Sequence, residues 1–177
     1  MLCSFLNQYE NKPLCVNKKL FQTLSDQFHQ NAFEKIKNEN SKLRTYATFK
    51  TEISIESYMS DIKDYKLRTQ LTKLRLSNHT LLIETGRHKT IPKEMRVCSF
   101  CPNSVEDELH FILQCPTYTI LRDKILTNLG EINPLLNLCS QEEKFKYIMR
   151  NINRDIAFFV TNCFNLRACL VSQNGGD

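Results

Sequence analysis

The sequence predicts a mainly α-helical fold built as one domain. The chain has 177 residues, a length that fits a single domain and allows a core of its own. Hydrophobic residues make up 41 % of the chain and are spread along it, which is typical of a globular protein. Only 4 glycines and 5 prolines are present, so tight turns should be few, and apolar residues recur at helical spacing.

The N-terminal part of the chain predicts an irregular segment followed by a helix. Residues 1–17 carry no apolar period, and the domain itself is expected to span 18–171. Apolar residues then recur every four positions, which predicts a helix with a slowly drifting stripe made by Leu20, Leu24, Phe28, Ala32 and Ile36. Polar residues at 37–41 end this pattern.

Two interpretations fit residues 42–63, namely a short strand at 53–55 or a helical turn near Tyr58. A second helix should follow and end near residues 77–78, with a face made by Leu67, Leu71 and Leu74. Residues 79–97 are predicted to form a loop or a weak hairpin, because a glycine and a proline interrupt the apolar pattern there.

The C-terminal half opens with two further predicted helices. Ser104, followed three residues later by an acid, indicates the N-cap of a helix through about Leu113. Pro116 is suited to the first turn of the next helix. That helix should bury a face made by Tyr118, Leu121, Ile125 and Leu129.

The last helical stretch begins at a capping box, in which Ser140 is followed three residues later by Glu143. Apolar residues continue at helical spacing over 145–152 and 156–170, with a kink expected near 151–153. Residues 172–177 are predicted to be a disordered tail.

The formal net charge is +5, and much of the excess lies between residues 63 and 96. A basic surface there could follow a phosphate backbone, and its candidate contacts are Lys73, Arg75, Arg87, Lys89, Lys93 and Arg96. Tyr65 and Phe100 could supply stacking on bases. A solvated helix face accounts for such a run of charges equally well.

The chain contains 8 cysteines, which would suit disulfides in a secreted protein. The first residues lack the basic and apolar regions of a signal peptide, and no run of about 18 apolar residues predicts a membrane span. An intracellular compartment, cytoplasmic or nuclear, is therefore expected, where closely spaced cysteines and histidines are typical of metal sites. Three of the cysteines lie beside apolar helix faces and should be buried thiols, namely Cys139, Cys163 and Cys169.

One cluster has the spacing of a metal site. Cys98 and Cys101 form a Cys-x-x-Cys turn, His110 follows after eight residues, and Cys115 after four more. Zinc prefers four tetrahedral ligands drawn from thiolate sulfur and imidazole nitrogen, so one zinc ion is predicted at this turn. The full prediction is a helical domain with a central Cys-Cys-His-Cys zinc turn and at most a short hairpin.

The predicted zinc site is structural, because protein side chains fill all four positions and leave no room for a reactive water. No glycine-rich phosphate loop and no Gly-x-Ser-x-Gly turn is present, and the acidic residues are not spaced for a two-metal site. The chain is therefore not expected to be an enzyme.

Several segments of the sequence, together with the Cys/His cluster, form a pattern known from one family. These segments are Lys42-Leu-Arg-Thr-Tyr46, Phe49-Lys-Thr-Glu52, Leu71-Thr-Lys-Leu-Arg-Leu-Ser-Asn-His79, Ile83-Glu-Thr-Gly-Arg87, Ile91-Pro92, Cys98-x-x-Cys101, Glu106-Asp-Glu-Leu-His-Phe111 and Cys115-Pro116. They resemble the C-terminal zinc-binding region of metazoan non-LTR retrotransposon reverse-transcriptase polyproteins. The similarity runs from about residue 20 to about residue 170, and it is most specific in the Cys/His core.

The resemblance implies that Cys98, Cys101, His110 and Cys115 are the zinc ligands and that the module holds template RNA or target DNA near a polymerase. The polymerase motif and an endonuclease are missing, and His88 stands where relatives often have an aromatic residue. The expected function is therefore a detached, zinc-stabilised nucleic-acid-binding accessory module. The alternatives are a zinc-braced helical module that binds a polymerase domain or a partner helix, or a non-functional retroelement remnant.

Overall fold

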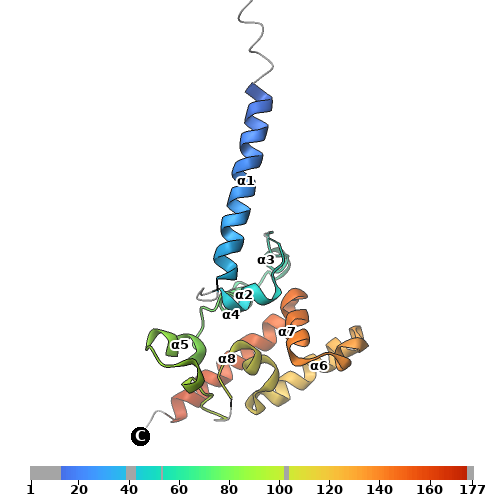
Figure 1. Ribbon diagram of the computed structural model, residues 1–177. Coiled ribbons are helices and arrows are strands. Elements are labelled where there is room, and N and C mark those ends of the chain that lie inside the picture. The colour runs from blue at the N-terminus through green and yellow to red at the C-terminus, as the bar shows by residue number, and fades with distance from the viewer. Residues whose placement is uncertain (1–12, 39–42, 53, 102–103, 175–177) are drawn as a thin grey trace, which may run out of the picture.

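Figure 1 presents the computed structural model, in which one long helix projects from a body of shorter helices. The structure describes residues 13–38, 43–52, 54–101 and 104–174. Within these ranges the only strand-like pairing is an isolated antiparallel bridge between Val97 and Val105. The prediction of a mainly α-helical fold with at most a short hairpin is therefore confirmed.

The projecting helix is α1, Pro13–Lys37. Residues 13–17 belong to it, so the prediction of an irregular segment is wrong there, and residues 1–12 lie outside the described ranges. The predicted apolar stripe is buried at one end of α1 and exposed along the rest. Its last turns pack on the body through buried Ile36 and half-buried Ala32, whereas its upper part leaves four large apolar side chains exposed: Leu20, Phe21, Leu24 and Phe28.

Three helices follow between residues 43 and 76: α2 Arg44–Phe49, α3 Tyr58–Asp61 and α4 Tyr65–Arg75. The helical turn near Tyr58 is thus the correct alternative, and residue 53 lies outside the described ranges. α4 begins where the Asp64 carboxylate accepts the backbone N–H groups of Lys66 and Leu67. It buries the predicted face of three leucines at positions 67, 71 and 74.

The stretch predicted as a loop or hairpin contains helix α5, Leu82–His88, and the short 3₁₀ turn η2, Lys93–Met95. That prediction is wrong because contacts distant in sequence hold α5 at its start. The Leu82 N–H donates to the Glu106 carboxylate at 2.7 Å, and the Ile83 N–H donates to the Glu106 carbonyl at 3.1 Å. The sequence of a seven-residue helix is too short to predict it, and it does not indicate that Glu106 would bind its first N–H groups.

The chain then forms a wide, π-type turn, η3 His110–Gln114, preceded by two residues in helical conformation. Its N-terminal cap is Asp107, whose carboxylate accepts the His110 N–H at 2.8 Å, so Ser104 is not the cap. Pro116 opens the next helical segment as predicted, with η4 Pro116–Tyr118 leading into α6 Thr119–Ile132.

After η5, Pro134–Leu138, the predicted capping box at Ser140 starts α7, Gln141–Arg150. The expected kink is a complete break before α8, Arg154–Asn174. α8 therefore includes residues 172–174 of the predicted tail, and 175–177 lie outside the described ranges.

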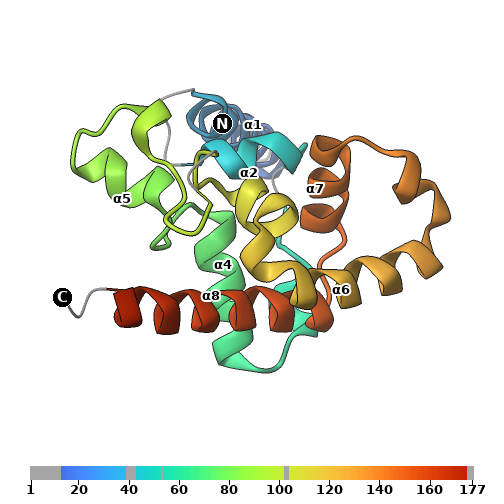
Figure 2. The same cartoon turned by 90° about the horizontal axis from the view of Figure 1, so that it is seen from below.

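Helix α8 runs across one side of the body and packs against α4 and α6 (Figure 2). The core lies between these helices and α7, and its buried side chains come from both halves of the sequence. Phe145, Ile148, Ile156 and Val160 are buried in it, so the predicted apolar faces of 145–152 and 156–170 belong to the domain's own core. No helix in the described ranges is long and apolar enough to cross a membrane.

Candidate metal centre

The four predicted ligands meet in one place. The ligand atoms of Cys98, Cys101, His110 and Cys115 all lie within 4.8 Å of one another. Cys101 Sγ lies 3.0 Å from His110 Nε2 and 3.7 Å from Cys115 Sγ, and the Sγ atoms of Cys98 and Cys115 lie 3.9 Å apart. The edge of a sulfur tetrahedron around zinc is about 3.8 Å, given a Zn–S bond of about 2.3 Å. This cluster can hold a metal ion.

Local backbone hydrogen bonds bring the two ligand pairs together. The loop after the Cys-x-x-Cys turn is closed where the Cys98 N–H donates to the Ser104 carbonyl at 2.8 Å. The second pair stands at the two ends of η3, where the Cys115 N–H donates to the His110 carbonyl at 2.8 Å. A bond across five residues widens the turn, so both side chains can face the same point.

The centre is largely shielded from water. Cys98, His110 and Cys115 are buried, and Cys101 is half-buried. Burial raises the pKa of the Cys98 thiol, and burial together with the neighbouring thiols raises that of Cys101 to about 12. Burial lowers the pKa of His110, which favours the neutral imidazole that a metal requires. Metal binding here would therefore release protons from thiols.

Arg122, which the sequence did not identify as a site residue, donates hydrogen bonds to backbone carbonyls beside the metal centre. Its Nε donates to the Ile112 carbonyl at 2.9 Å, and its Nη2 donates to the Cys115 carbonyl. Arg122 is buried, and burial lowers its pKa. It restrains the backbone that carries Cys115, the last ligand.

A second buried polar pair ties the centre to the C-terminal helix. Arg167 on α8 donates through Nε and Nη2 to the two carboxylate oxygens of Glu106, at 2.8 and 2.9 Å. The same carboxylate accepts the Leu82 N–H at the start of α5. Glu106 thus joins α5 and α8 to the loop between the ligand pairs.

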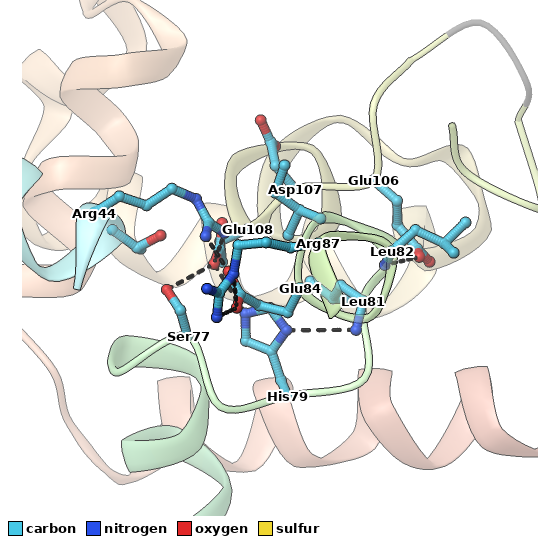
Figure 3. Close-up of polar contacts among 12 residues, drawn as sticks. Arg44, Ser77, His79, Leu81, Leu82, Glu84, Arg87, Glu106, Asp107 and Glu108 are labelled. Carbon is cyan, nitrogen blue, oxygen red and sulfur yellow. Dashed lines mark hydrogen bonds and ion pairs between the residues drawn. The ribbon is translucent and has the colours of Figure 1, made fainter. Parts of the chain in front are cut away.

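Glu108 and Glu84 form the centre of a buried ionic network shown in Figure 3. Glu108 Oε1 accepts from Arg44 at 2.7 Å, His79 Nε2 at 2.9 Å and Ser77 Oγ at 3.2 Å. Burial raises the pKa of Glu108, but the hydrogen bond from His79 and the charge of Arg44 outweigh it and lower the value to about 2. Arg44 also pairs with Glu84 and so bridges the two carboxylates.

The six candidate nucleic-acid contacts divide into two groups. The three arginines are used within the protein: Arg75 is buried, Arg87 pairs with Glu84 at 3.0 Å, and Arg96 donates to the Ile91 and Ile83 carbonyls. The three exposed members are Lys73, Lys89 and Lys93. Any phosphate surface in this segment therefore depends on its lysines.

The two proposed stacking residues differ in exposure. Tyr65 is 73 % exposed, whereas Phe100 is half-buried against the core.

The three cysteines predicted as buried thiols also differ in exposure. Cys163 is buried as predicted and Cys139 is half-buried, but Cys169 is exposed, so its prediction as a buried thiol is wrong. The cysteine lies on the outer face of α8, which the apolar pattern did not resolve.

No family model, curated protein or solved structure matches this chain. Its functional interpretation therefore depends on its own residues and on the chemistry that they support.

Proposed function

We propose that this chain is a nucleic-acid-binding accessory module held in shape by one structural zinc ion, with no catalysis of its own. The observation that carries the proposal is the closed Cys3His cluster, whose ligand atoms lie within 4.8 Å of one another. Zinc suits three thiolates and one imidazole in a tetrahedron, and four protein ligands leave no position for a reacting group. The proposal includes descent from the retrotransposon region that the sequence resembles.

The nucleic-acid part of the proposal is supported by exposed lysines on the segment leading to the cluster. Lys66 and Lys73 lie two turns apart on α4, about 10 Å along the helix. Lys89 and Lys93 follow α5 and are exposed as well. None of these four ammonium groups has a partner within the described ranges, so each is free to contact phosphate.

Zinc is tested by elemental analysis of protein purified without added metal. We expect about one zinc per chain, and loss of the metal together with a lower unfolding temperature in Cys101→Ser. Cys139→Ser is the matched control, because this half-buried thiol lies outside the cluster. A metal-free protein in which Cys101→Ser unfolds like the wild type would contradict the structural role.

Nucleic-acid binding is tested by titrating RNA and DNA strands at several salt concentrations. The triple variant Lys73→Ala, Lys89→Ala, Lys93→Ala should bind more weakly, and its log–log salt slope should fall by about 2. Its matched control removes the same charge from α1 at exposed Lys18, Lys19 and Lys35. Absence of binding to either polymer at low salt would reject this function.

The second candidate is a protein-interaction module, favoured by the exposed stripe on α1. Leu20, Phe21, Leu24 and Phe28 are each more than half exposed and line successive turns of a helix that projects from the body. Such a stripe suits an amphipathic helix of a partner protein. Phe21→Ser with Phe28→Ser should leave folding intact and abolish co-purification of that partner, with Ile120→Ser on α6 as the control.

A further inference from the structure

A cavity of about 390 Å³ lies between the C-terminal end of α4, the turn that follows it, and α8. The residues around it that bear on its chemistry are Gln70, Lys73, Asn78, His79, Phe164 and Asn165. The volume falls within the range of small-molecule binding pockets. The cavity contains none of the four ligands of the metal centre.

The turn that forms one wall is built to keep a single shape. α4 ends in a Schellman motif, in which the Asn78 N–H donates to the Lys73 carbonyl at 2.8 Å and the Ser77 N–H to the Leu74 carbonyl at 3.2 Å. Ser77 is in the left-handed region with φ 50°, and its hydroxyl donates to buried Glu108. His79 donates to the same carboxylate, so the wall is anchored at two points.

Four of the polar side chains around the cavity have no partner among the described residues. Neither the amides of Gln70, Asn78 and Asn165 nor the ammonium of Lys73 has a hydrogen bond or ion pair with any residue in the described ranges. His79 differs, because its Nε2 is committed to Glu108. Three amides and one cation thus line the cavity and remain available to a ligand.

Aromatic surface completes the lining. The Phe164 ring is half-buried, lies 4.6 Å from the Phe111 ring centroid and 6.2 Å from that of His79, and borders the cavity. Amides that can both donate and accept recognise the Watson–Crick edge of a base, aromatic rings contact its flat face, and a lysine pairs with the adjoining phosphate.

We propose that this cavity takes one unpaired nucleobase of a single strand, with Lys73 on a flanking phosphate. The inference rests on the proposed nucleic-acid function and narrows its substrate to single-stranded or locally unpaired RNA or DNA. A base within a duplex is stacked on both faces and paired at its edge, so it cannot enter a pocket without leaving the helix. Lys66, two turns from Lys73 on α4, extends the path for the strand.

The test compares three labelled probes of equal length at low salt: a mixed-sequence single strand, the same strand with abasic sites throughout, and its duplex. We expect the single strand to bind about tenfold more tightly than the abasic strand, which carries the same charge but no base. The variant Asn78→Ala with Asn165→Ala should remove that difference. Asn31→Ala with Asn128→Ala removes two exposed amides elsewhere and should leave it unchanged.

The outcomes separate this inference from the function on which it rests. If the three probes bind alike and the Asn78/Asn165 variant matches the wild type, the cavity proposal is overturned while nucleic-acid binding stands. If no probe binds at low salt, both fail. Thermal unfolding of each variant shows whether folding is retained, which we expect because neither amide has a partner in the described part of the chain.

Discussion

Arg75 shows how a charged residue of the basic segment is incorporated into the core. Its guanidinium carbon lies 4.4 Å from the Phe49 ring centroid and 5.1 Å from that of Tyr58, and Nη2 pairs with Glu56 at 2.7 Å. Stacking and pairing together offset the cost of burying the charge. A pattern of charges along the sequence cannot distinguish this arginine from exposed Lys73, two residues earlier.

Replacing Glu56 by Gln tests this arrangement and its dependence on pH. Burial raises the pKa of Glu56, but hydrogen bonds from Lys50 and Tyr46 and the charge of Arg75 outweigh it, and the net pKa is lowered from 4.5. The ionised carboxylate therefore stabilises the fold at pH values above the pKa that Glu56 has in the unfolded chain. This contribution is lost as pH falls below about 4.5. We expect Glu56→Gln to cost about 1 kcal/mol near neutral pH, because the carboxylate is only partly buried.

Urea unfolding at a series of pH values provides the measurement. The difference between wild type and Glu56→Gln should shrink as pH falls from 5 toward 3, whereas exposed Glu52→Gln should change little throughout. The metal centre is the same in all three proteins, so acid release of a metal cancels in the comparison. A difference that stays constant across this range would contradict the ionic role of Glu56.

Ser77 combines a strained backbone with a buried hydrogen bond, and two substitutions separate the two effects. Ser77→Ala keeps a Cβ at this position of left-handed backbone but loses the hydrogen bond to Glu108. This loss should lower the free energy of unfolding by about 2 kcal/mol. Ser77→Gly loses the same bond but relieves about 1 kcal/mol of backbone strain. The free energy of unfolding should fall in the order wild type, Gly, Ala. A glycine variant less stable than the alanine variant would show that the left-handed conformation is not what this position requires.

At the scale of elements, the short helix α5 is held by a partner distant in sequence. α5 has seven residues, and its first N–H groups are held by Glu106 in the loop between the ligand pairs. α1 and α8, with 25 and 21 residues, are long enough to show a periodic pattern in the sequence. The metal centre should therefore control α5 more strongly than α1.

Removal of metal from the protein by a chelator checks this order. Amide hydrogen exchange should accelerate first in 82–88 and 104–115, because the loop that presents Glu106 is closed by the cluster. Exchange in α1 should stay as in the metal-loaded protein. Uniform acceleration over the whole chain would instead mean that the centre supports the fold globally.

The helix α6 and the capping box of α7 could be predicted because each depends on residues close in sequence. The four metal ligands could be predicted for the same reason, since eighteen residues contain all of them. Glu106 and Arg167, in contrast, are 61 positions apart, and Arg75 and the Met149 carbonyl are 74 apart. No local pattern reports such pairs, so the support of the site was missed while its ligands were found.

For the whole molecule, α8 is the element that joins the parts. It packs on α4 and α6, and its Arg167 reaches the loop between the ligand pairs. The candidate base cavity lies on the α4 side of α8, through Phe164 and Asn165. The metal centre, the α4 lysines and the cavity thus share one scaffold, so a change at α8 should reach all three.

Helix α1 alters how the molecule rotates in water. Its 25 residues extend about 37 Å, and most of that length projects beyond the body (Figure 1). An elongated particle tumbles end over end more slowly than it spins about its long axis. Backbone N–H bonds in a helix point along its axis, so the amides of α1 should relax in NMR experiments with a longer effective correlation time than amides of helices lying across it. Binding of a partner to α1 would lengthen that correlation time further, so the relaxation of the α1 amides would report the binding.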